Sequence, residues 1–150
     1  LAFLKGLDGW EPREATMHSK TENGPTILVV DDYDDVRASL RCWLEGRGYN
    51  VMEAIDGQTA IEIASQHRPD LILMDIGLPK RSGISAAYKI RKDITLRDVP
   101  IVAITGYDTA DLHEDALRAG CVSYVTKPID MSELQKIITR LLNQEEPQAL

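Results

Sequence analysis

The chain has 150 residues, of which 43% are hydrophobic and 27% are charged, and its formal net charge is −7. This length and composition fit one globular domain with a substantial core, and they leave little room for two. The acidic balance argues against a surface that binds nucleic-acid phosphates, and we find no apolar run suited to a signal peptide or a membrane span. Cys42 and Cys121 lack metal-ligand or disulfide-framework spacing, so we expect two reduced thiols in a cytoplasmic protein.

Polar segments flank the central part of the chain. Residues 18–25 have the sequence HSKTENGP and residues 143–150 the sequence NQEEPQAL. We therefore expect residues 1–25 to form a flexible leader or linker, residues 26–143 to form the folded domain, and residues 144–150 to form a polar tail. Because the first internal methionine is Met17, residues 1–16 have three open origins: an expression vector, an upstream linker or a mis-assigned start.

Short apolar segments alternate with longer segments of helical spacing between these ends. The runs TILVVD, DLILMD and VPIVAIT are nearly continuous and end in a polar residue, as expected for strands covered on both faces. NVMEA and VSYVT are weaker strand candidates. Helices are predicted at residues 34–46, 58–67, 82–92 and 110–119, and a fifth is predicted to begin at Asp130, whose side chain can cap it. This alternation predicts an α/β fold with an open, doubly wound parallel sheet.

Polar residues follow four of the predicted strands. They are Asp31 and Asp32, Asp75, Thr105, and Lys127. In open α/β sheets the functional crevice lies outside the carboxyl ends of the strands, so we expect these side chains to converge. Any one of them alone is explained equally well as a helix cap or turn former. Taken together they favour one shared site.

The residue types in this set indicate a chemistry. Three carboxylates held close together repel one another unless a cation lies among them. A small divalent ion with oxygen ligands, Mg²⁺ above all, meets that need and keeps positions open for phosphate oxygens. Lys127 and Thr105 supply a positive charge and a hydrogen-bond donor for a phosphoryl group, and one aspartate then acts as the nucleophile.

Four motifs in this order resemble the receiver domain of two-component response regulators, the CheY-like family. They are ILVVDDYDDVRASL, DLILMDIGLPKRSG, VPIVAITG and AGCVSYVTKPID, and the resemblance covers residues 26–143. It implies a flavodoxin-like fold of five βα units with strand order 2-1-3-4-5. It also implies a signalling phosphoacceptor rather than a classical enzyme, which accepts a phosphoryl group from a histidine kinase or histidine phosphotransfer protein within a phosphorelay.

The resemblance also implies a role for each site residue. Asp75 would be the phosphoacceptor, Asp32 a direct Mg²⁺ ligand, and Asp31 a ligand acting mainly through a metal-bound water. The backbone carbonyl of Gly77 would complete the protein ligands of the metal. Lys127 would pair with the phosphoryl oxygens, and its bond to Pro128 is expected to be cis.

The same resemblance implies a switch. Thr105 would move toward the phosphoryl group and Tyr124 would follow it inward, which alters the surface formed by the fourth helix, the fifth strand and the fifth helix. An output partner, whose identity stays open, or a second copy of the domain would bind there. Gly77 and Tyr107 occupy the variable positions that we expect to set the dephosphorylation rate. Read without the family, Tyr124 is a half-buried strand aromatic.

Alternatives stay open beside this interpretation. The segment DYDDV matches the DxDx(T/V) signature of haloacid-dehalogenase-type phosphatases, with Asp32 as nucleophile and Asp34 as acid/base. That reading leaves Asp75 without a role, and Asp34 is equally expected at the start of a helix. A pseudo-receiver that only binds partners is the other alternative.

The chain is either a stand-alone regulator or a piece of a longer regulator or hybrid kinase. His18, His67 and His113 show no metal-ligand spacing, and Trp43 is interpreted as packing.

Overall fold

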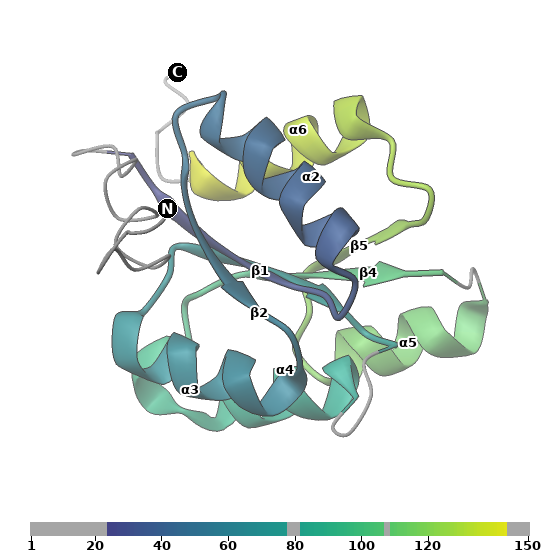
Figure 1. Ribbon diagram of the computed structural model, residues 1–150. Helices are drawn as coiled ribbons and strands as arrows, with labels where there is room; N and C mark the ends of the chain where they lie inside the picture. Colours follow the sequence, from purple (N-terminus) through teal and green to yellow (C-terminus); the bar gives the residue numbers. More distant parts are fainter. Residues whose placement is uncertain (1–23, 78–81, 107–108, 144–150) are drawn as a thin grey trace, which may run out of the picture.

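The computed structural model describes residues 24–77, 82–106 and 109–143. Its centre is one parallel sheet with the strand order β2-β1-β3-β4-β5, which confirms the predicted fold class and order (Figure 1). The strands are β1 (Thr26–Val30), β2 (Asn50–Ala54), β3 (Leu71–Asp75), β4 (Ile101–Thr105) and β5 (Ser123–Thr126). All five lie where the apolar segments of the sequence placed them.

Helices cover both faces of the sheet. On one face lie α2 (Asp34–Glu45) and α6 (Met131–Leu142), and on the other lie α3 (Gly57–His67), α4 (Gly83–Lys92) and α5 (Ala110–Arg118) (Figure 1). The predicted helices correspond to these five, with ends that differ by one residue. The surface predicted from the fourth helix, fifth strand and fifth helix is therefore the α5-β5-α6 surface.

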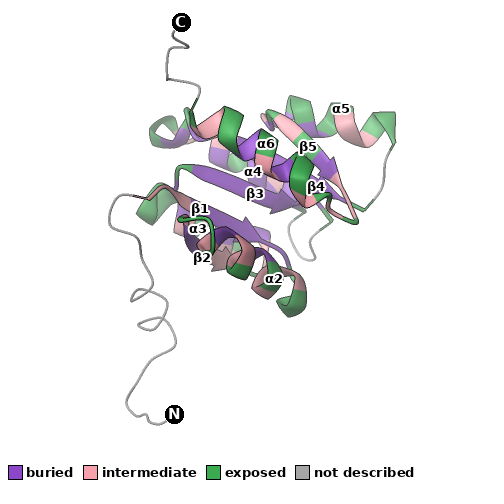
Figure 2. Ribbon diagram, turned by 90° about the horizontal axis from the view of Figure 1, so that it is seen from above, coloured by how far each residue is buried: buried purple, intermediate pink, exposed green. Residues whose placement is uncertain are grey.

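Strands β1 to β4 each contribute side chains to two cores, because successive side chains point to opposite faces of the sheet. In β1, Ile27 and Val29 pack toward α2 and α6, whereas Leu28 and Val30 pack toward α3, α4 and α5. All five residues of β3 and of β4 are buried, which is the reason that these runs are apolar almost without interruption (Figure 2). Trp43 is partly buried against the α2 and α6 core, as expected for a packing residue.

Local signals account for most helix ends. The side chains of Asp56, Ser82, Thr109 and Asp130 each accept a hydrogen bond from a backbone amide in the first turn of α3, α4, α5 and α6. Helix α2 ends where the sequence predicted, with Gly46 as a right-handed cap, and Gly48 follows in the left-handed region with a φ of 92°. Sequence reasoning missed one short element, the 3-10 helix η1 (Ile94–Leu96).

Arg91, in the last turn of α4, ties three segments together. Its guanidinium donates hydrogen bonds to four backbone carbonyls, those of Leu96 (3.2 Å), Arg97 (2.7 Å), Val99 (2.9 Å) and Gly120 (3.2 Å). Gly120 has a φ of +104°, and a Cβ atom there would lie 2.8 Å from Nε of Arg91. The end of α4, the turn after η1 and the turn after α5 are thus held at one point. Within the described residues, no helix has the length and apolarity that crossing a membrane requires.

Candidate functional site: an acidic pocket at the strand ends

Three carboxylates gather at the carboxyl ends of β1 and β3. Val30 of β1 lies opposite Met74 of β3, so the next residues, Asp31 and Asp75, lie side by side. Asp31, Asp32 and Asp75 each offer a carboxylate oxygen, and these oxygens lie within 4.8 Å of one another. Asp31 and Asp75 are buried, with 1% and 6% of their surface exposed, whereas Asp32 is exposed. The cluster therefore has a buried floor and one member at the solvent edge.

Lys127 brings a positive charge to this floor from the end of β5. Its Nζ lies 3.1 Å from Oδ2 of Asp31 and 3.2 Å from Oδ2 of Asp75, so it bridges the two buried acids. Its backbone amide donates to the carbonyl oxygen of Thr105 (2.8 Å), which fixes the end of β5 against β4. The Lys127–Pro128 peptide bond is cis, as the family resemblance implied.

The charges in the pocket do not balance, since three carboxylates face one ammonium group. Burial raises the pKa of the Asp75 carboxyl, the amide of Gly77 lowers it through a hydrogen bond to Oδ1 (2.9 Å), and the charge of Asp31 raises it further. Lys127 lowers the same pKa, but the net pKa of Asp75 stays above its ordinary value. Burial alone would lower the pKa of Lys127, but Asp31 and Asp75 outweigh it and raise that pKa. A second cation would relieve the remaining negative charge.

The turn that carries Asp31 and Asp32 is held from the side by Arg37 of α2. The Arg37 guanidinium donates to the backbone carbonyl of Asp31 (2.9 Å) and pairs with Asp34 (2.7 Å) and Glu53 (3.0 Å). Oδ1 of Asp31 also accepts a hydrogen bond from the amide of Tyr33 (2.9 Å). Arg37 was not singled out from the sequence. The one feature that could have indicated its role is its position on α2, one turn after Asp34.

Gly83 places α4 directly on the strand end that carries Asp75. A Cβ atom at Gly83 would meet the carbonyl oxygen of Asp75 and would lie 2.5 Å from Cα of Ile76. Such distances are far below van der Waals contact, so only glycine fits there without movement of the backbone. Gly83 thus allows the first turn of α4 to pack against the centre of the site.

The two residues expected to form the switch lie on neighbouring strands. Thr105 is buried at the end of β4, whereas Tyr124 of β5 is 37% exposed. The Tyr124 ring stacks on the imidazole of His113 from α5, with ring centroids 3.5 Å apart and an interplanar angle of 26°. The sequence pointed to Tyr124 but not to its contact with His113.

Gly77 and Tyr107 are the positions expected to set the dephosphorylation rate, and Gly106 and Pro79 belong to the motifs that resemble the family. Gly77 and Gly106 are exposed beside Asp75 and Thr105, and a Cβ at Gly106 would meet nothing within 4 Å. Tyr107 and Pro79 lie outside the described residues.

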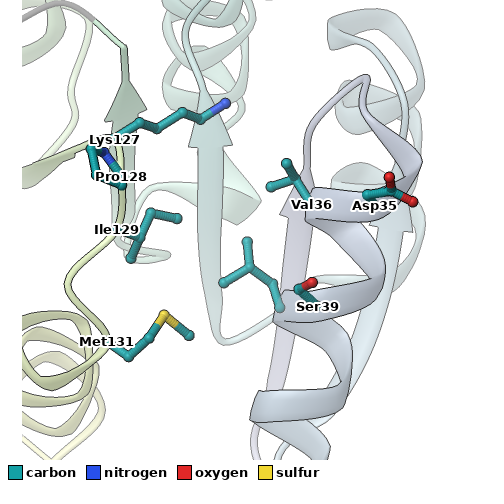
Figure 3. A pocket seen from close by; sticks show the side chains of 8 residues that line it. Asp35, Val36, Ser39, Lys127, Pro128, Ile129 and Met131 are labelled. Atoms are coloured by element: carbon teal, nitrogen blue, oxygen red, sulfur yellow. The ribbon is translucent and has the colours of Figure 1, made fainter.

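An apolar cleft of about 320 Å³ adjoins the acidic pocket, between α2 and the segment that joins β5 to α6 (Figure 3). Lys127 lines the cleft and also contacts Asp31 and Asp75, so the cleft lies beside the acidic cluster. The apolar lining comes from Val36, Leu40, Pro128, Ile129 and Met131, and the polar rim from Asp35 and Ser39.

Comparison with known proteins gives a consistent result. Residues 27–139 match the family model described as response regulator receiver domain. The transcriptional regulatory protein PdtaR of Mycobacterium tuberculosis is 40% identical over 109 residues, which cover 72% of this chain and 52% of PdtaR. The polar-differentiation response regulator DivK of Brucella anthropi is 32% identical over 117 residues, which cover 78% of this chain and 95% of DivK. The chain therefore matches about half the length of PdtaR and nearly all of DivK.

Solved structures resemble this fold closely. The receiver domain of the sensor histidine kinase PA1611 from Pseudomonas aeruginosa, with a magnesium ion coordinated in its active-site cleft, has a TM-score of 0.75 and 37% identity. That match covers 80% of this chain and 98% of the other. The chemotaxis protein CheY4 of Vibrio cholerae has a TM-score of 0.76 and 26% identity, covering 79% of this chain and 99% of CheY4.

Proposed function

Because the chain belongs to the response regulator receiver family of two-component signalling, we propose that it accepts a phosphoryl group on Asp75 from a histidine kinase or histidine phosphotransfer protein. The observation that carries this proposal is the bridge that Nζ of Lys127 makes between Asp31 and Asp75, at 3.1 and 3.2 Å, beside the exposed Asp32. A cation already placed against the acceptor carboxylate is positioned to pair with phosphoryl oxygens.

We infer that Asp31, Asp32 and Asp75 hold Mg²⁺, together with the backbone carbonyl of Gly77. The three carboxylates are hard oxygen donors, and their oxygens lie within 4.8 Å of one another. Asp31 already engages Lys127 and the amide of Tyr33, which suits a ligand that acts through a water molecule. The bound ion would supply positive charge that stabilises the oxygens of the phosphoryl group in transfer.

The transfer itself is a single displacement. A carboxylate oxygen of Asp75 attacks the phosphorus of a phosphohistidine, the new P–O bond forms as the P–N bond breaks, and the donor imidazole leaves with the electron pair. Lys127 then exchanges part of its contact with the carboxylates for contact with the phosphoryl oxygens. The hydroxyl of Thr105, at the end of the next strand, donates a hydrogen bond to the same group.

We expect Thr105 and Tyr124 to transmit the phosphorylation signal from Asp75 to the surface of the domain. With Thr105 drawn toward the phosphoryl group, Tyr124 moves inward, and the α5-β5-α6 surface changes its affinity for an output partner or a second copy of the domain. Phosphorylation thus shifts a population between two packings of one fold.

The apolar cleft is the place where we expect the phosphodonor protein to dock. A helix of the donor with apolar side chains would fill the space between Val36 and Met131, and Lys127, which lines this cleft, also contacts Asp75. A donor bound in this cleft would hold its phosphohistidine close to Asp75.

The phosphatase alternative is weakened by the position of Asp34. In that reading Asp34 is the acid/base, but its side chain is 86% exposed and pairs with Arg37 at 2.7 Å. Asp75, which that reading leaves without a role, is the buried carboxylate that Lys127 contacts.

The test is the intact mass of the protein after incubation with acetyl phosphate, with and without Mg²⁺. We expect one phosphoryl adduct in the wild type, dependent on Mg²⁺, that is absent in Asp75→Asn and strongly reduced in Asp32→Asn. No adduct in the wild type, even after a rapid quench, would favour a pseudo-receiver. An adduct that survives Asp75→Asn but not Asp32→Asn would restore the phosphatase interpretation.

The docking cleft has its own test. Replacing Ser39 on the rim by Arg should slow transfer from a phosphorylated histidine protein while leaving the reaction with acetyl phosphate unchanged, because the small donor needs no docking surface. Equal rates of protein-to-protein transfer for wild type and Ser39→Arg would place docking elsewhere. Glu62→Arg, on the exposed side of α3, is the matched control.

A further inference from the structure

The stacked pair His113 and Tyr124 links α5 to the edge strand of the described sheet. We propose that His113 is a positioning residue that holds Tyr124 in its outward orientation and thereby sets the resting bias of the domain. This inference rests on the proposed function, in which Tyr124 must move inward. It adds a residue that the motifs of the sequence did not indicate.

The geometry makes the two positions of Tyr124 exclusive. Tyr124 lies opposite Ala103 of β4, and Thr105 follows Ala103 on the same face of the same strand. The small side chain of Ala103 gives the tyrosine ring little to pack against on that side, whereas the imidazole of His113 covers one face of the ring at 3.5 Å. A large rotation of Tyr124 toward Thr105 separates the two rings, so the stack must be broken before the inward state forms.

His113 is also well placed to sense the acceptor site. Thr109 caps α5, and the backbone amide of His113 donates to the carbonyl of Thr109 (3.1 Å). The imidazole therefore lies one helical turn from the N-terminal end of α5, which is the end nearer to Thr105 in the sequence. A displacement of this helix end would shift the imidazole relative to Tyr124.

The size of the bias follows from the strength of aromatic stacking. A stacked aromatic pair changes the ratio of outward to inward Tyr124 by roughly 2- to 10-fold. If only the inward conformer reacts well, the rate of phosphorylation scales with its population. Removing the imidazole should then raise the rate by about the same factor.

The first test needs no phosphorylation. In the ¹H NMR spectrum of the unphosphorylated chain, we expect the imidazole C–H signals of His113 to be shifted upfield by the Tyr124 ring. The shift should disappear in Tyr124→Ala, while the signals of the exposed His67 stay in place. His113→Gln identifies the signals by their loss. A His113 spectrum that is indifferent to Tyr124→Ala overturns the proposal.

The second test is a double-mutant cycle on the rate of phosphorylation by acetyl phosphate. We expect His113→Ala to raise the rate about 2- to 10-fold in the wild type, and to have no effect in a Tyr124→Ala background. His113→Phe, which keeps a stacking ring, should stay near the wild-type rate, and His67→Ala is the control.

Two results of the cycle contradict the proposal. One is an equal effect of His113→Ala in both backgrounds, which means that the residue acts on general packing. The other is no effect in either background. If the wild type accepts no phosphoryl group, the proposed function fails, and the NMR comparison alone decides whether His113 positions Tyr124.

Discussion

A methyl group added at Gly83 should damage both stability and phosphorylation. In Gly83→Ala the new Cβ would lie 2.5 Å from Cα of Ile76, and it would meet the carbonyl oxygen of Asp75. Two carbon atoms pack best at about 3.5 Å, so α4 and the end of β3 must separate by about 1 Å. Overpacking of this kind costs about 1 to 3 kcal/mol, which lowers the melting temperature of a domain of this size by roughly 4 to 12 °C.

Asp75, the proposed phosphoacceptor, is the last residue of β3 and lies on the strand end that has to move. A misplacement of about 1 Å at a reacting group can cost roughly 100-fold in rate. We therefore expect phosphorylation of Gly83→Ala by acetyl phosphate to slow by roughly 10- to 100-fold, measured by intact mass at a temperature where the variant remains folded.

Gly46→Ala is the matched control, because its Cβ would come no closer than 3.4 Å to any atom, and Gly46 has a right-handed φ of −64°. A Gly83→Ala protein that melts and reacts like Gly46→Ala would refute the close approach of α4 to Asp75.

Three further outcomes follow from the pKa values and the hydrogen bonds. The folded-state pKa of Asp75 is raised, chiefly by burial, so the stability contributed by this carboxyl is present below its unfolded pKa and lost as pH rises through its folded pKa. Without Mg²⁺, Asp75→Asn should therefore melt above the wild type at pH 7, and this gain should shrink below about pH 4; equal differences at both pH values would contradict the assignment. Burial raises the pKa of the Cys121 thiol to about 11, whereas Cys42 is exposed, so iodoacetamide at pH 8 should modify Cys42 alone in the folded protein and both thiols in urea. Arg91→Met removes the donor of four carbonyl groups and should lower the free energy of unfolding by about 2 to 4 kcal/mol in urea titrations; an unchanged midpoint would show that water replaces the guanidinium at no cost.

The sequence was most informative where burial is continuous. The runs that became β1, β3 and β4 are apolar because both faces of each strand are covered, and this signal does not depend on distant residues. The start of α6 was also readable, since Asp130 caps it through contacts within three residues. Ser82 and Thr109 cap α4 and α5 in the same local way, although they were not singled out from the sequence. The short η1 was missed because its cap by Asp93 spans only two residues and leaves no periodic pattern.

The sequence predicted which residues meet at the strand ends, but it did not predict how each of them is buried or held. The rule that parallel strands end at one edge brings Asp31, Asp75 and Lys127 together. It does not say that Asp31 is buried while Asp32 is exposed, because this depends on how the turn after β1 is held by Arg37. The stack of His113 on Tyr124 was beyond reach for a related reason: it joins a helix and a strand whose relative position is set by packing of the whole sheet.

The hydrogen bonds of Arg91 hold the C-terminal end of α5, so a displacement at its N-terminal end would tilt the helix about that point. The carbonyl of Gly120, just past the C-terminus of α5, is bound to the guanidinium, while the opposite end of the helix follows Thr105 and Gly106. Nine residues of helix span about 13 Å, so a shift of about 1 Å at the Thr109 end corresponds to a tilt of about 4° around Gly120. The displacement would then decrease along the helix towards Gly120. A partner that binds the α5-β5-α6 surface, as proposed, would therefore distinguish the two states best through contacts with the first turn of α5.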